Sequence, residues 1–295
     1  MHNRSLSLAL LLSVGPAIMP AQTPPPLPAP WDSLGKILRT TGTQASGYYR
    51  YGWPRRDITL QIGDVTVAPA MALGAWAGFA GKPAAATVMG DLVLLPEEVR
   101  PVLAELAHQR IGVSAIHNHL LGEPTVIYVH FHAEGEAVDL AERLDRVLAK
   151  TKTPRPVTAA APQPVTIDTA TIFKTLGLHG RAQGNIAQLS TVLVSRPVTM
   201  DGRPLNPGLA YGTPINIQML DSVRAVATGD FSITADKVTP VLNALVAGGI
   251  QPTALHTHLI GELPKIYYMH FWADGKLSDV LNGLRAALDE ARAAP

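Results

Sequence analysis

The strongest constraint on the fold is an internal repeat that spans most of the chain. The stretch AIHNHLLGE at residues 115–123 returns as ALHTHLIGE at residues 254–262, which is 139 residues later. GDLVLLPEEVRPVL, which begins at residue 90, matches GDFSITADKVTPVL, which begins at residue 229, at the same spacing. Two copies are too few for a solenoid, so the repeat predicts two homologous domains.

Proline-rich segments precede and separate the two copies. Closely spaced prolines favour extended backbone without a core of its own, so we expect a spacer at residues 22–31 and a Pro/Ala-rich linker at residues 151–166. The first repeat is then predicted at residues 32–150 and the second at residues 167–295.

The first residues have the pattern of a secretory signal. One arginine, Arg4, precedes an apolar run at residues 6–19, and small residues follow. We expect residues 1–21 to be a signal peptide and the protein to be exported, periplasmic or secreted; the alternative is an ordinary buried helix. The run is too short for a confident transmembrane span, so we expect none after signal removal.

The chain contains no Cys, and its formal net charge is +1. We therefore expect no lipid attachment through a lipobox cysteine, no disulfide and no thiolate metal site. A near-zero charge without a basic cluster also argues against a nucleic-acid partner.

Periodicity predicts the same order of elements in both repeats. A short helix opens each copy, with Asp32 and Asp168 as the expected N-caps. Short strands follow, including residues 57–67, and then a strand that ends in GDLVLL. The next helix has apolar residues at helical spacing, namely Val99, Val102, Leu103 and Leu106.

The remainder of each copy contains the histidines. The strand SAIHNHLL is followed by a turn at residues 122–124, the returning strand VIYVHFHA and a helix over residues 136–150. The order strand, helix, strand, strand, helix predicts an α+β fold. Each repeat should be a mainly antiparallel sheet with helices packed on one face.

Seven of the ten histidines gather in these two regions: His117, His119, His130 and His132 in the first copy, and His256, His258 and His270 in the second. Trp272 replaces His132 in the second copy. Residues i and i+2 of a strand point to the same face, so each His-x-His pair projects side by side. An antiparallel return brings the third histidine opposite them, with Glu123 or Glu262 at the turn.

Three imidazoles and one carboxylate suit a divalent transition metal. Zinc is our first choice, and copper, iron and manganese are also compatible. We predict that the seven histidines are metal ligands and that Glu123 and Glu262 are the catalytic candidates, each as general base. The alternative is that the histidines are half-buried sheet residues that bond to backbone carbonyls.

Other polar residues receive structural predictions. Asp91 and Asp230 follow glycine in the repeated Gly-Asp pair and are expected to serve a turn or bulge before the strand. Tyr128 and Tyr268 flank the third histidine and are expected to form a wall. The charges that follow Trp53-Pro54 are expected at the surface, namely Arg55, Arg56 and Asp57.

The repeated phrases MGDLVLL, AIHNHLLGE, ALHTHLIGE and MHFWADG resemble the LppY/LpqO-type family of bacterial envelope proteins, defined by domain of unknown function 1259. The resemblance covers nearly all of residues 32–292. It implies an exported bacterial protein made of two related halves, and it implies no established reaction. The chain departs from the family's lipoproteins because it has no lipobox cysteine.

Three functions are compatible with the sequence. The first is an exported envelope protein that binds a transition metal, or a small ligand through it, at two equal sites or one composite site. The second is a metal-dependent, hydrolase-type enzyme in which a glutamate activates metal-bound water. The third is a structural or interaction module without metal. A difference between the repeats, such as His132 against Trp272, favours catalysis, and metal content separates the first two functions from the third.

Overall fold

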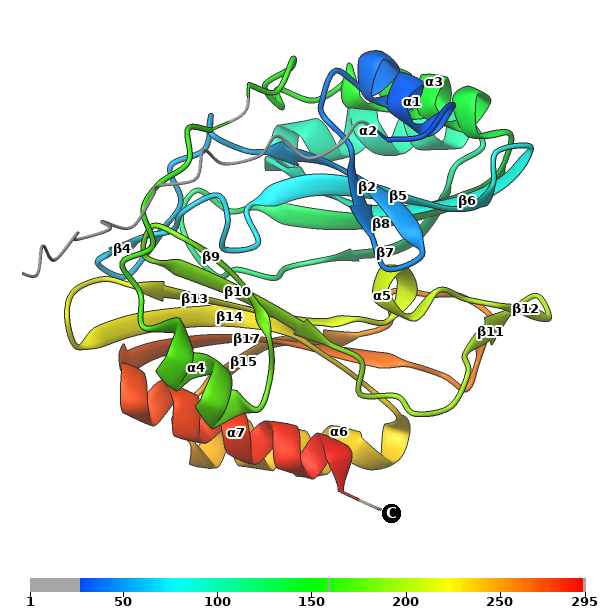
Figure 1. The fold of residues 1–295 in the computed structure, drawn as a ribbon. Coiled ribbons are helices and arrows are strands. Elements are labelled where there is room, and N and C mark those ends of the chain that lie inside the picture. Colours follow the sequence, from blue (N-terminus) through cyan, green and yellow to red (C-terminus); the bar gives the residue numbers. More distant parts are fainter. Residues whose placement is uncertain (1–26, 159, 294–295) are drawn as a thin grey trace, which may run out of the picture.

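The computed structural model describes residues 27–158 and 160–293. The predicted signal peptide and residues 22–26 of the spacer lie outside the described residues. The described chain forms four layers, with two central sheets packed face to face and helices on both outer faces (Figure 1). Each half is an antiparallel sheet with helices on one face, so the predicted α+β fold with two similar halves is confirmed.

The first repeat contains three helices and a six-stranded sheet in the order β1-β2-β5-β6-β8-β7, with a short β3-β4 hairpin beside it. Its elements are α1 (Trp31–Leu38), β1 (Thr43–Ala45), β2 (Tyr48–Pro54), β3 (Gln61–Ile62), β4 (Val65–Thr66), β5 (Gly74–Lys82), β6 (Ala85–Leu94), α2 (Pro96–His108), β7 (Gly112–His117), β8 (Ile127–Gly135) and α3 (Ala137–Leu148).

The second repeat has the equivalent sheet in the order β15-β17-β14-β13-β10-β9 and a small β12-β11-β16 sheet. Its elements are α4 (Thr169–Leu176), β9 (Gly180–Gln183), β10 (Ile186–Thr191), β11 (Thr199–Met200), β12 (Arg203–Pro204), α5 (Pro207–Ala210), β13 (Thr213–Met219), β14 (Arg224–Ile233), α6 (Ala235–Ala247), β15 (Gln251–His256), β16 (Glu262–Leu263), β17 (Tyr267–Lys276) and α7 (Leu277–Arg292).

The two predicted N-caps have different outcomes. Asp168 caps α4, because its carboxylate accepts a hydrogen bond from the Thr171 backbone N–H at 3.1 Å. The prediction for Asp32 is wrong: α1 begins at Trp31, directly after Pro30, and has no side-chain cap. Asp32 lies inside the first turn instead, where a carboxylate still interacts favourably with the helix dipole.

Strand alternation gives each central sheet two different faces. In β8, Val129, Phe131 and Ala133 point to the helices and join the first core. The residues between them point the other way, toward the second sheet. The second repeat builds an equivalent helix-side core around Phe231 and Phe271.

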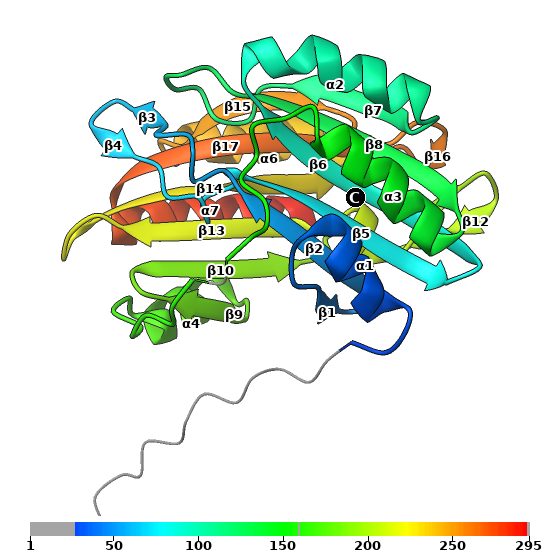
Figure 2. The same ribbon diagram turned by 90° about the horizontal axis from the view of Figure 1, so that it is seen from above.

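Residues of both repeats share the space between the sheets. One mixed cluster packs Leu60 and Tyr128 of the first repeat with Val226 and Trp272 of the second. At the edge of this interface, both guanidinium NH groups of Arg224 bind the carboxylate of Asp64 at 2.7 Å. Side chains of both repeats therefore form the interface between the inner faces of the sheets. Figure 2 shows the strands of the two sheets from above.

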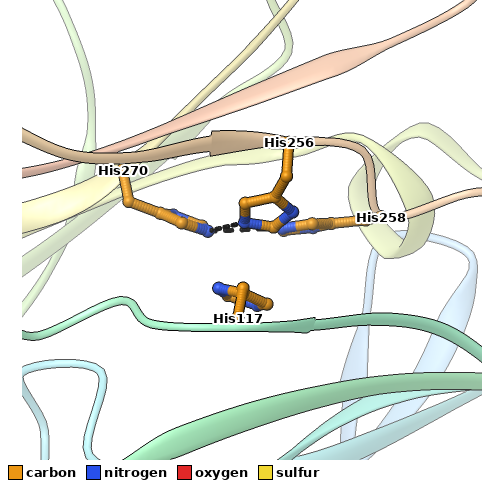
Figure 3. Close-up of side chains that lie close together, drawn as sticks. All are labelled: His117, His256, His258 and His270. Atoms are coloured by element: carbon orange, nitrogen blue, oxygen red, sulfur yellow. Dashed lines mark hydrogen bonds between the residues drawn. The ribbon is translucent and has the colours of Figure 1, made fainter.

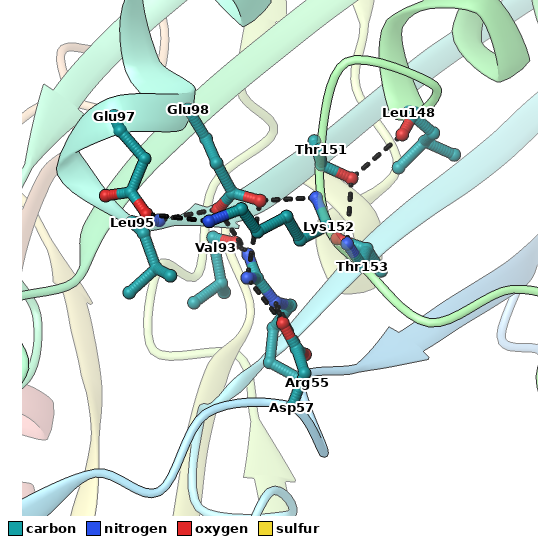
Figure 4. A network of polar contacts seen from close by, with 10 residues as sticks. All are labelled: Arg55, Asp57, Val93, Leu95, Glu97, Glu98, Leu148, Thr151, Lys152 and Thr153. Atoms are coloured by element: carbon teal, nitrogen blue, oxygen red, sulfur yellow. Dashed lines mark hydrogen bonds and ion pairs between the residues drawn. The ribbon is translucent and has the colours of Figure 1, made fainter.

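A buried ion-pair network ties the first repeat together (Figure 4). The Arg55 side chain is fully buried and pairs with Glu98 at 2.8 Å and Asp57 at 2.8 Å. Glu98 also accepts hydrogen bonds from the backbone N–H groups of Leu95 and Lys152. The prediction that Arg55 is a surface charge is wrong, because carboxylates from a neighbouring loop and from α2 compensate its burial.

Within residues 27–158 and 160–293, no helix is both long enough and apolar enough to cross a membrane.

Candidate metal centre

The two repeats present the same pair of residues at the middle of their inner faces. Asp91 of β6 lies directly opposite His130 of β8, and Asp230 of β14 lies directly opposite His270 of β17. Both aspartates are inside long strands, so the prediction that they serve a turn or bulge before the strand is wrong. The glycine before each one is needed for close packing: a Cβ at Gly90 would lie 2.2 Å from the Trp76 carbonyl oxygen.

The His-x-His pairs lie at the ends of the adjacent edge strands. His117 is the last residue of β7 and His256 the last of β15, while His119 and His258 follow just beyond the strands. Packing the two sheets face to face brings both pairs to one place. We call this set the histidine centre: Asp91, His117, His119, His130, Asp230, His256, His258 and His270.

Contacts between imidazoles cross the interface between the repeats. The ring centroids of His117 and His256 are 3.9 Å apart, those of His119 and His270 are 4.0 Å apart, and His130 stacks on His258 at 3.7 Å. The sequence predicted the members of each copy, and the structure joins six of the seven histidines in one composite centre. Figure 3 shows His117 facing the three histidines of the second repeat.

Four of these residues form the largest group whose side chains could hold one ion: His117, His256, His258 and His270. Their ligand nitrogens all lie within 4.8 Å of one another. The Nε2 atoms of His256 and His270 are 2.8 Å apart, and those of His258 and His270 are 3.4 Å apart. Two further groups could hold an ion, Asp91 with His117 and His130, and His119 with Asp230 and His270.

Hydrogen bonds orient three of the four rings. His117 Nδ1 lies 2.8 Å from the Asn118 carbonyl oxygen, and His256 Nδ1 lies 3.2 Å from that of Thr257. A carbonyl oxygen can only accept, so both Nδ1 atoms carry the proton. His270 Nδ1 lies 2.7 Å from the Asp230 carboxyl group and donates to it when Asp230 is ionised.

The surroundings keep these imidazoles neutral. Loss of solvation lowers the pKa of His117 to about 2, with smaller contributions from repulsion by His270 and His256. Burial likewise lowers the pKa values of the other members, His119, His130, His256, His258 and His270. Neutral imidazole is the form that binds metal ions.

Both aspartates are shielded from water. Burial raises the pKa of Asp91 well above its usual value, and repulsion by Asp230 adds to the effect. Burial also raises the pKa of Asp230, against the attraction of His119 and His256. The sequence-based site lacked these two carboxylates, although the repeated Gly-Asp pair at the 139-residue spacing was the signal that could have identified them.

The two predicted glutamates lie outside the histidine centre. Glu123 is exposed at the turn, where its backbone pairs with Gln61. Glu262 is buried, but its carboxylate accepts hydrogen bonds from the Ile266 backbone N–H at 3.1 Å and from Lys265 at 3.3 Å. Neither belongs to a group that could hold an ion. Their role as general bases stays a prediction.

His132 and Trp272 mark the main difference between the two halves. Trp272 packs into the mixed apolar cluster between the sheets. His132 lines a cavity of about 40 Å³ together with Ser114, His130 and His258. The predicted wall role of the tyrosines agrees with their contacts, since Tyr128 and Tyr268 are buried and donate to the carbonyls of Ala72 and Ala210.

Comparison with known proteins identifies the family. The family model described as Domain of Unknown Function (DUF1259) matches residues 32–150 and again residues 170–290. The chain belongs to this family. The DUF1259 protein is therefore an internal duplication, as its sequence predicted.

The comparisons with solved structures and with curated proteins do not indicate a function for this DUF1259 protein. EtuB from Clostridium kluyveri, known from a crystal structure, is similar at 12% sequence identity, with 84% of this chain and 89% of that chain covered. The TM-score of 0.20 is too low to support an argument from that structure. No curated protein matches the chain.

Proposed function

We propose that this DUF1259 protein is an exported protein that binds a divalent transition metal between its two repeats, with zinc as the first choice. The observation that carries the proposal is the orientation of three imidazoles. His117, His256 and His270 each direct an unprotonated Nε2 into the same space, because Nδ1 is held by an acceptor in each ring.

This arrangement is unfavourable without a cation. The lone pairs of His256 and His270 face each other across 2.8 Å, and no proton lies between them once both Nδ1 atoms carry one. The Nε2 atom of His117 is buried with no hydrogen-bond partner in the described part of the chain. A positive ion at the common centre would satisfy all of these nitrogens.

The donors and spacing favour a transition metal. Magnesium and calcium prefer oxygen ligands, whereas imidazole nitrogen suits zinc, copper, iron and nickel. Zinc–nitrogen bonds of about 2.0–2.1 Å in tetrahedral geometry place two ligand nitrogens about 3.3–3.4 Å apart. His258 Nε2 and His270 Nε2 are 3.4 Å apart, so this pair already has the tetrahedral spacing.

The residues behind the ligands match a metal site as well. A metal-bound histidine usually donates its other N–H to a carboxylate or carbonyl, which fixes the ring and makes the ligand nitrogen more basic. Asp230 supplies the carboxylate for His270, and backbone carbonyls supply the acceptors for the other two rings.

Metal content tests the proposal directly. Protein purified without a histidine tag should bind zinc in an equilibrium titration followed by elemental analysis, and zinc at about 100 times its Kd should add about 2.7 kcal/mol to the free energy of unfolding. The double variant His258→Gln/His270→Gln should lose this gain. The matched control is His108→Gln/His179→Gln, which removes two exposed histidines.

The proposal fails if the folded, chelator-treated protein takes up none of zinc, copper, iron or manganese. It also fails if the surface control loses metal to the same extent as the double variant. Export is tested separately, by expressing the whole chain in a bacterium, fractionating the cells and sequencing the amino terminus of the product. A cytoplasmic product that retains Met1 would contradict the export proposal and leave the metal proposal intact.

A further inference from the structure

The buried atoms that lack hydrogen-bond partners concentrate in one part of the histidine centre. Among the described residues, five buried side-chain atoms have no partner, and three of them are Asp91 Oδ1, His117 Nε2 and His130 Nε2. Such atoms are rare because each one costs desolvation without a compensating bond. These three residues are also one of the groups whose ligand atoms lie within 4.8 Å of one another.

We propose that the histidine centre holds a second divalent transition-metal ion, bound by Asp91, His117 and His130. The first ion is then held by His256, His258 and His270. This inference rests on the proposed function. It adds a second ion and moves His117 from the ligands of the first ion to those of the second, because His117 belongs to two of the groups that could hold an ion.

The division follows from the available donor atoms. His117 has a single free nitrogen, because its Nδ1 donates to the Asn118 carbonyl, so it serves only one of the two ions. If His117 binds the same ion as Asp91 and His130, that ion satisfies all three buried atoms that lack a hydrogen-bond partner. The other three histidines still surround the first ion, so each ion receives three protein ligands.

The buried carboxylate of Asp91 also favours a cation at this position. Asp91 is 8% exposed, and within residues 27–158 and 160–293 no lysine or arginine lies within ion-pair distance of its carboxylate. The nearest charged-group contact of Asp91 is His130 Nε2, at 3.7 Å from Oδ2, which is too long for a hydrogen bond. Arg50 attracts the Asp91 carboxylate, but only from beyond ion-pair distance. A buried carboxylate with no cation in contact is costly, and a divalent ion between Asp91 and the two imidazoles would compensate it.

The pseudo-equivalent residues in the second repeat behave differently. Asp230 is 2.7 Å from His270 Nδ1 and is already satisfied as a hydrogen-bond acceptor. Asp91 has no such bond to His130. One aspartate therefore orients a ligand of the first ion, while the other is free to be a ligand of the second.

Three protein ligands leave a coordination position for water or a small ligand. The cavity of about 40 Å³ lined by Ser114, His130, His132 and His258 lies at this side of the centre. A single water needs only about 10–15 Å³ of such space. His132, the histidine without a counterpart in the second repeat, thus borders the place where an exchangeable ligand would reach the second ion.

The number of ions per chain tests this inference. Tag-free, chelator-treated protein is titrated with Co²⁺, whose visible absorption reports bound ion, and with Zn²⁺ followed by elemental analysis after dialysis. We expect two ions per chain for the unmodified protein and one for Asp91→Asn, a nearly isosteric change. His130→Gln should give the same loss, and His119→Gln, which alters a histidine outside both ligand sets, should retain two ions.

Each outcome separates the two proposals. No bound ion overturns both. One ion in the unmodified protein, unchanged by Asp91→Asn and His130→Gln, overturns the second site and leaves the proposed function intact. Two ions that become one only in His119→Gln also overturn the assignment, because the second ion would then lie at His119, Asp230 and His270. Far-ultraviolet circular dichroism and cooperative unfolding establish that each variant is folded.

Discussion

Two buried polar clusters of this protein have opposite hydrogen-bonding states. In the Arg55 network, the guanidinium bonds to Asp57, Glu98 and the Val93 carbonyl, and Glu98 receives two backbone N–H groups in addition. In the histidine centre, three buried atoms have no partner in the described chain, and the Nε2 atoms of His256 and His270 lie 2.8 Å apart.

The difference separates a structural cluster from a binding site. A buried ion pair whose atoms are all satisfied fixes the positions of the elements that it joins. A buried cluster of unsatisfied hydrogen-bond acceptors that point toward one another is unfavourable alone, and it becomes favourable when a cation binds. Both clusters contain buried polar side chains, so burial alone does not distinguish them. The number of buried atoms without a hydrogen-bond partner predicts which cluster binds an ion.

The largest expected effect is acid unfolding of the metal-free protein. The histidines of the centre have folded-state pKa values below the unfolded value of 6.5, and that of His117 falls to about 2. The unfolded chain therefore binds more protons below pH 6.5. Stability is complete above this pH and is lost as the pH falls, by up to about 1.4 kcal/mol per unit for each histidine.

The losses from several histidines add up as the pH falls, and the raised pKa values of Asp91 and Asp230 offset part of the total. Chelator-treated protein should therefore unfold cooperatively on mild acidification, as measured by urea unfolding between pH 7.5 and 4.5. His117→Gln should make the decline shallower. A free energy of unfolding that stays constant from pH 7 to pH 5 would contradict this account of the centre.

The second-largest expected effect concerns the Arg55 network, whose charged groups are hydrogen-bonded to one another. Arg55→Ala should lower the free energy of unfolding by about 3–5 kcal/mol, because it leaves the Glu98 carboxylate buried without its cation. The control is Glu97→Ala, which breaks the exposed pair with Lys152 at 3.0 Å and should cost much less than Arg55→Ala, because solvent screens that pair. Equal losses in denaturant titrations of the two variants would show that the network has no special structural role.

The sequence predicted the elements of each repeat well because both repeats are strongly periodic. Helix α2 follows the apolar spacing of Val102 and Leu106, and β8 follows the alternation on either side of His130. His-x-His spacing likewise pointed to four histidines of the centre, although His119 and His258 lie just beyond the strand ends rather than on the same strand face as their partners. Local pattern was sufficient for these features.

Contacts between distant segments were beyond the reach of local pattern. Nothing in either copy alone states that the sheets pack inner face to inner face, so one composite site and two separate sites were equally compatible with the spacing. Arg55 reads as a surface charge because its partner Glu98 is 43 residues away. Asp91 reads as a turn residue because the glycine before it signals a turn, whereas that glycine avoids a clash between neighbouring strands.

The smallest expected effect has the opposite sign to that of Arg55→Ala. Burial and Asp230 raise the pKa of Asp91 in the metal-free protein, so the ionised side chain opposes folding above its unfolded pKa of 3.8. Asp91→Asn removes this charge and should stabilise the metal-free protein by about 1–3 kcal/mol near neutral pH.

The gain from Asp91→Asn should grow as the pH rises above 3.8, because the unfolded chain has released the Asp91 proton there, whereas the raised pKa makes its release from the folded protein costly. Asp230→Asn is the matched control. Asp230 lies at hydrogen-bond distance from His270, so its replacement should stabilise the metal-free protein less than Asp91→Asn does. At saturating zinc, Asp91→Asn should instead be less stable than the unmodified protein, because it lacks a ligand of the second ion. If Asp91→Asn instead destabilises the metal-free protein as Arg55→Ala does, then Asp91 has a structural partner, and the contrast between the two clusters does not hold.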